Sequence, residues 1–82
     1  MESNPTEVFY TISDFGKQGR SVVIYEFSQE RSILNEESLK IAIKNIKRNR
    51  NIYISQEAYE HEVDMYQGAL DYLQKFNREH PQ

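Results

Sequence analysis

Residues 21–27 read Ser21-Val22-Val23-Ile24-Tyr25-Glu26-Phe27, the densest run of β-branched and aromatic side chains in the chain. Residues of these types are enriched in strands, and apolar groups on both faces are typical of a strand that has a neighbour on each side. We therefore expect this run to form the central strand of a sheet.

The residues that precede this run predict its partner. Apolar side chains recur every second residue within residues 7–13, at Val8, Tyr10 and Ile12, which is the period of a half-buried strand. Residues 14–19 contain two glycines and an aspartate, which favour a hairpin loop. The two runs together predict a β-hairpin.

A polar connection and a helix are predicted after the hairpin. Residues 28–33 are polar except at their end and indicate a connection. Asn35 is a favourable helix cap followed by two acidic residues, and the helix is expected to end between Arg48 and Asn51. The apolar residues of this helix form one stripe that should face the sheet: Leu39, Ala42, Ile43 and Ile46.

A second, longer helix is predicted from a cap at Ser55 to about Arg78. Its apolar residues form two adjacent stripes that cover roughly half of the helix circumference. These are Tyr59, Val63, Tyr66, Leu70 and Leu73, and beside them Ala58, Met65, Ala69, Tyr72 and Phe76. Between the two helices, residues 52–54 (Ile-Tyr-Ile) fit a short third strand.

These elements predict a single α+β domain over residues 1–82, in the order ββα(β)α, with both helices on one face of a small sheet. Residues 1–6 and 80–82 are expected to be flexible. The absence of cysteine excludes disulfides and thiolate metal sites, and no apolar run approaches the ~20 residues of a membrane span. We expect a cytoplasmic protein without a membrane partner. Its composition, rich in Ile, Asn, Lys and Tyr and lacking Trp, is typical of a low-GC bacterial or phage source.

The formal charge of −3 is unevenly distributed, since residues 35–50 carry five basic and two acidic side chains. A basic face with a neighbouring tyrosine could bind the phosphates and stack on a base of a nucleic acid. The residues of this alternative are Lys40, Lys44, Lys47, Arg48, Arg50 and Tyr53. The other interpretation is a solvated helix face in which Glu36 pairs with Lys40, and the overall pI of 5.3 favours it.

Glu62 is unusual because it falls in the middle of the apolar arc of the long helix. A buried carboxylate there would need an Arg or Lys partner and would mark a candidate active site, whereas a position at the sheet edge would leave it solvated. Glu57, His61 and Asp64 share the polar face of the same helix, and we interpret them as a solvated charge cluster. No nucleophile motif or phosphate loop is present, so we expect no enzyme, cofactor or metal site.

The apolar arc of the long helix is wider than is needed to pack against a small sheet and one other helix. Its tyrosines tolerate a partly solvated contact. The sequence therefore predicts a small non-enzymatic interaction module, such as a regulator, adaptor or inhibitor. It would bind a partner protein, or itself as a homodimer, through the long helix. The predicted contact residues are Tyr59, Glu62, Met65, Tyr66, Tyr72 and Phe76.

Overall fold

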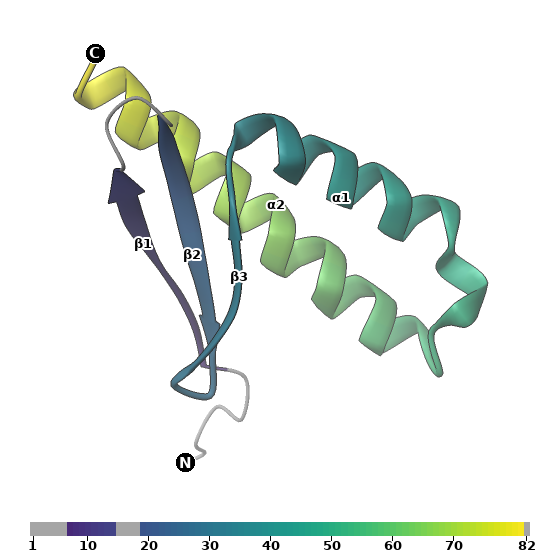
Figure 1. Cartoon of the computed structure of the whole chain (residues 1–82). Helices are drawn as coiled ribbons and strands as arrows, with labels where there is room; N and C mark the ends of the chain where they lie inside the picture. Colours follow the sequence, from purple (N-terminus) through teal and green to yellow (C-terminus); the bar gives the residue numbers. More distant parts are fainter. Residues whose placement is uncertain (1–6, 15–18, 82) are drawn as a thin grey trace.

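The structure is a computed structural model of the chain and describes residues 7–14 and 19–81 (Figure 1). Its elements are β1 (Val8–Asp14), β2 (Arg20–Glu26), β3 (Gln29–Leu34), α1 (Glu36–Arg48), a short 3-10 helix η2 (Arg50–Ile52) and α2 (Gln56–Glu79). The predicted α+β class is confirmed, in the order β1-β2-β3-α1-α2. Residues 1–6, which are predicted to be flexible, lie outside the described residues, and so do residues 15–18 of the predicted hairpin loop.

The three strands form an antiparallel sheet in the order β1-β2-β3, so the predicted central strand is confirmed, except that it ends at Glu26 and Phe27 belongs to the turn. In the register, Ile24 lies between Tyr10 of β1 and Ser32 of β3. The next pair toward the turn joins Tyr25 to Glu30, which leaves Arg31 as an extra residue on β3. This irregularity is a β-bulge, and it changes the side of the sheet to which the side chain of Arg31 points.

The predicted connection at residues 28–33 is wrong, because most of it belongs to β3. Five of its six residues lack the β-branched or aromatic side chains that indicate a strand, a composition that is common at sheet edges. The turn before it also gives no sequence signal. Phe27 and Ser28 both have positive φ, at 55° and 66°, as a type I′ hairpin requires, although Asn-Gly is the usual pair there.

Replacing Phe27 with Asn and Ser28 with Gly is expected to raise the free energy of unfolding by about 1 kcal/mol, because L residues with side chains are strained in the left-handed region. Urea unfolding followed by circular dichroism measures the change. The control is Ser28→Ala, which keeps a side chain at the same φ and should bring no gain. A double variant no more stable than the wild type would contradict the expectation.

The short third strand predicted at residues 52–54 is also wrong. Arg50–Ile52 form the 3-10 helix η2, and Ile52 and Ile54 are 70% and 96% exposed. In Figure 1 this connection lies at the far end of the two helices, away from the sheet, so no strand edge is available to it. β-branched residues favour a strand only where a neighbouring strand can pair with them.

Both helices begin at the predicted caps. Asn35 Oδ1 accepts a hydrogen bond from Ser38 N at 2.8 Å, and Ser55 Oγ accepts one from Ala58 N at 3.0 Å. The end of α1 falls within the predicted range, but Asn49 has φ −105° and not the left-handed conformation that asparagine often adopts at a cap. Its side chain donates to Asn45 O at 3.0 Å instead.

The two helices pack against each other, and α2 runs across one face of the sheet while α1 continues from the end of β3 (Figure 1). The buried residues between them come from β2, α1 and α2: Val22, Ile24, Leu39, Ile43, Met65, Ala69, Leu70 and Leu73. Four members of the predicted arc therefore complete the core of the chain itself.

Although α2 has 24 residues, no helix in the described part of the chain is apolar enough to cross a membrane.

Candidate functional site

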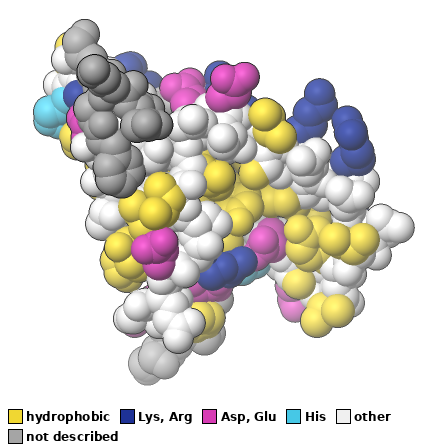
Figure 2. All heavy atoms as spheres, viewed as in Figure 1, with side chains coloured by type: hydrophobic (Ala, Val, Ile, Leu, Met, Phe, Trp, Pro, Cys, Tyr) yellow, Lys and Arg dark blue, Asp and Glu magenta, His cyan; other side chains and the backbone are white. Residues whose placement is uncertain are grey.

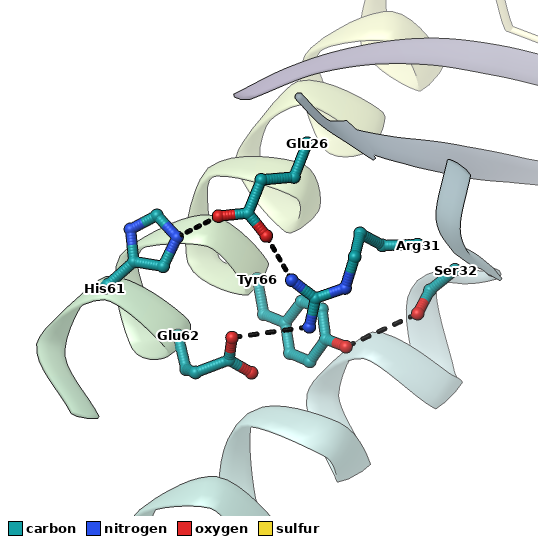
Figure 3. A network of polar contacts seen from close by, with 6 residues as sticks. All are labelled: Glu26, Arg31, Ser32, His61, Glu62 and Tyr66. Atoms are coloured by element: carbon teal, nitrogen blue, oxygen red, sulfur yellow. Dashed lines mark hydrogen bonds and ion pairs between the residues drawn. The ribbon is translucent and has the colours of Figure 1, made fainter. Parts of the chain in front are cut away.

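A buried carboxylate lies at the end of β2 that is closest to the start of α2. Glu26 is 8% exposed because it follows Val22 and Ile24 at a spacing of two and so faces α2 with them. Its Oε2 accepts a hydrogen bond from His61 Nε2 at 2.6 Å, and its Oε1 accepts one from Arg31 Nη1. Figure 3 shows these groups converging from β2, β3 and α2.

Arg31 connects the two carboxylates of this cluster. The bulge places its guanidinium on the side of the sheet that faces α2, where Nη2 donates to Glu62 Oε2 at 3.4 Å. Next to it, Ser32 Oγ lies 3.4 Å from Tyr66 Oη, so β3 and α2 are joined at two successive residues (Figure 3). We call Glu26, Arg31, His61 and Glu62 the ion cluster.

The electrostatics of the ion cluster favour the charged forms of Glu26 and Arg31. Burial alone would raise the pKa of Glu26, but hydrogen bonds from His61 and Arg31 and the charge of Arg31 outweigh it, so the pKa of Glu26 is lowered. Burial opposes the charge of Arg31 as well, yet Glu62 and Glu26 raise its pKa. Each carboxylate therefore faces a cation, which is the arrangement of a structural ion cluster.

Glu26 is expected to make stability depend on pH. Because its pKa is lower in the folded chain than in the unfolded chain, its stabilisation is present above the unfolded pKa and is lost as the pH falls through the folded value. Urea unfolding at several pH values between neutral and acidic should therefore show the wild type losing its advantage over Glu26→Gln at acidic pH. The control is Glu30→Gln, since Glu30 is exposed and has no ion pair within the described residues. A constant difference between wild type and Glu26→Gln would contradict this assignment.

The prediction for Glu62 and its helical neighbours is partly corrected. Glu62 has a side chain that is 21% exposed and has the Arg partner that a buried carboxylate would need. The solvated charge cluster predicted for Glu57, His61 and Asp64 is wrong for His61, whose ring pairs with Glu26. Within the residues that the structure describes, no group of three or more His, Cys, Asp or Glu is placed to hold a metal ion.

The six contact residues predicted on the long helix lie in several different environments. Met65 is in the core, at 2% exposure, and Tyr66 packs against the core. Phe76 is half-buried and stacks on His80 with ring centroids 4.2 Å apart, and Tyr72 is 40% exposed. Of the remaining two residues, Tyr59 lies beside the connection between the two helices, and Glu62 belongs to the ion cluster. The structure does not bring the six together on one surface.

The predicted basic residues are exposed along α1 and the connection that follows it. Lys40 Nζ lies 3.4 Å from Glu36 Oε2, so the predicted pairing of these two residues is confirmed. Arg48, Arg50 and Tyr53 line an open groove of about 490 Å³ between the end of α1 and the start of α2. We call it the connection groove, and its lining also includes Ser55, Gln56 and Tyr59.

A third surface lies on the side of the sheet opposite α2, and sequence reasoning did not identify it. Side chains of a strand alternate, so the residues next to the core-facing Tyr10, Ile24 and Ser32 point away from the helices. We call these residues the open sheet face: Phe9, Thr11, Val23, Tyr25 and Ile33. Figure 2 shows hydrophobic side chains gathered over the strands, and a hollow between the strands and the helices.

The open sheet face is apolar where a solvated sheet face is normally polar. Phe9 and Tyr25 stack with their ring centroids 4.8 Å apart and their planes nearly parallel. Phe9 and Ile33 are 46% and 45% exposed, and none of the described helices covers them.

No protein family model, curated protein or solved structure matches this chain. The evidence on function therefore comes from the ion cluster, the connection groove and the open sheet face.

Proposed function

We propose that this chain is a non-enzymatic interaction module that binds a protein through the open sheet face, and that a second copy of the chain is the first partner to test. The observation that carries the proposal is the pair of exposed apolar residues Phe9 and Ile33 on a sheet face that no described helix covers. Exposed apolar side chains on an uncovered sheet face are typical of an interaction site.

The composition of the open sheet face supports a second copy as the partner. Its five residues carry no formal charge, and Glu30, which pairs with Tyr25 in the register and so points to the same side, is exposed on the edge strand β3. Two copies stacked through this face would therefore bury aromatic and aliphatic side chains and leave the two Glu30 carboxylates at the edge of the contact. The same face meets itself in a two-fold dimer, which is the commonest symmetry of soluble oligomers.

The ion cluster supports a non-enzymatic function. Its two carboxylates both pair with Arg31, and Glu26 also pairs with His61. A general acid or base needs a group that can exchange a proton with a substrate, whereas these groups neutralise one another. The cluster therefore supports the interpretation of a scaffold that fixes β3 on α2.

The proposal is tested by sedimentation velocity over a range of protein concentrations. The wild type is expected to form a dimer, and Phe9→Lys with Ile33→Lys is expected to be monomeric, because two buried ammonium groups would oppose stacking. The matched control is Ile41→Lys, since Ile41 is 53% exposed on α1 and lies away from the sheet. A wild type that remains monomeric at high concentration would refute the dimer, and equal effects of the control would refute the assignment to this face.

A further inference from the structure

The connection groove combines two cationic groups with no acidic residue in its lining. Neither Arg48 nor Arg50 forms an ion pair within the described part of the chain. Arg50 Nη2 donates to the neutral Gln56 Oε1, and its guanidinium lies 5.1 Å from the ring centroid of Tyr59. Its position is thus fixed on the wall of the groove while its charge is not neutralised, which suits an anionic ligand such as a phosphate.

An aromatic side chain stands beside these cations. Tyr53 and Tyr59 meet edge to face with their centroids 5.9 Å apart. Arg50 occupies one face of Tyr59, so Tyr53, which is only half-buried, is the better platform for a planar ligand. A guanidinium next to an available aromatic ring is the combination on which single-stranded nucleic acids bind, with the phosphate on the cation and the base on the ring.

The positive charge continues beyond the groove. Lys44 and Lys47 are exposed on α1 at a spacing of i, i+3, so they lie on one side of the helix that leads to Arg48. Figure 2 shows basic side chains at the upper right of the view, over α1. Lys40 contributes less, because Glu36 neutralises it. A ligand longer than one nucleotide would find further phosphate contacts along this track.

We propose that the connection groove binds single-stranded nucleic acid, with a phosphate held by Arg48 and Arg50 and the adjacent base stacked on Tyr53. This activity is separate from protein binding through the open sheet face, because the two surfaces are at different ends of the fold. A free nucleotide offers the same chemistry, so the experiment includes both sources.

The test is fluorescence anisotropy with a labelled single-stranded oligonucleotide of about ten nucleotides at about 50 mM salt. The full chain is expected to bind, and Arg48→Ala with Arg50→Ala is expected to weaken binding at least tenfold and to reduce the steepness of its salt dependence. Tyr53→Leu should weaken it about tenfold by removing the stack, and Tyr53→Phe should retain it. The matched control is Lys75→Ala, an exposed cation in the last third of α2.

Competition identifies the ligand. If the proposal holds, unlabelled oligonucleotide displaces the probe at lower concentration than a mononucleotide, and inorganic phosphate displaces it least. Equal displacement by mononucleotide and oligonucleotide would overturn the assignment to a nucleic-acid strand in favour of a free nucleotide. Absence of binding at low salt, or equal weakening by Lys75→Ala and by the arginine variant, would overturn the site itself.

Discussion

Arg31→Met is expected to lower the free energy of unfolding by about 2 kcal/mol, a large part of the stability of a domain of this size. The variant keeps the apolar stem of the side chain and removes its charge. Glu26, whose side chain is 9% exposed, then retains only His61, and Glu62 loses its cation. Removing one partner of a fully buried pair costs more, but the Arg31 side chain is 38% exposed and water replaces part of the lost interaction.

Two further variants separate the energy of the pair from the penalty of an unpaired charge. Glu26→Met with Arg31→Met removes both charges, and it should recover most of the loss, because apolar replacement of an ion pair is often close to neutral. Glu62→Gln removes only the more exposed pair and should cost less than about 1 kcal/mol. Urea unfolding measures all three. A double variant that is less stable than Arg31→Met alone would show that the cluster stabilises the fold in its own right.

The two helices and the central strand are the parts of the fold that local sequence patterns predicted. The caps at Asn35 and Ser55 and the period of the apolar residues located both helices, and the dense apolar run at residues 21–27 located the central strand. β3 was missed for two physical reasons. Its residues are mostly polar, as an edge strand allows, and the turn before it uses Phe27 and Ser28 in a backbone conformation that glycine and asparagine normally signal.

The ion cluster was only partly predictable. Glu26 follows Val22 and Ile24 at a spacing of two, so the period of β2 could have placed it on the helix-facing side. Arg31 could not be placed in this way, because the bulge interrupts the alternation of β3. From the sequence, the apolar arc on α2 is wider than the core of the chain itself requires, which predicted that a partner protein covers part of it. In the structure, a third strand and α1 help to enclose that arc, and the exposed apolar residues Phe9 and Ile33 lie on the opposite face of the sheet.

Gly68→Ala is expected to destabilise the domain by about 1–2 kcal/mol, although alanine is the better helix former by about 1 kcal/mol. A Cβ at Gly68 would lie 2.5 Å from Tyr10 Oη and 3.3 Å from Tyr10 Cζ. The Tyr10 side chain cannot move away freely, because Oη donates to Met65 O at 2.8 Å and the ring packs against the core and Tyr72. Accommodating the methyl group therefore breaks a hydrogen bond between β1 and α2.

The cause is tested by repeating the substitution without the hydroxyl. In a Tyr10→Phe background the closest contact is absent and the hydrogen bond is already lost, so Gly68→Ala should stabilise the chain by about 0.5 kcal/mol through helix propensity. The change of sign corresponds to a coupling energy of about 2 kcal/mol between two residues in contact. Thermal and urea unfolding of the four proteins in this cycle give the coupling. Equal effects of Gly68→Ala in both backgrounds would mean that the close approach of β1 to α2 at Tyr10 is not what excludes a side chain at residue 68.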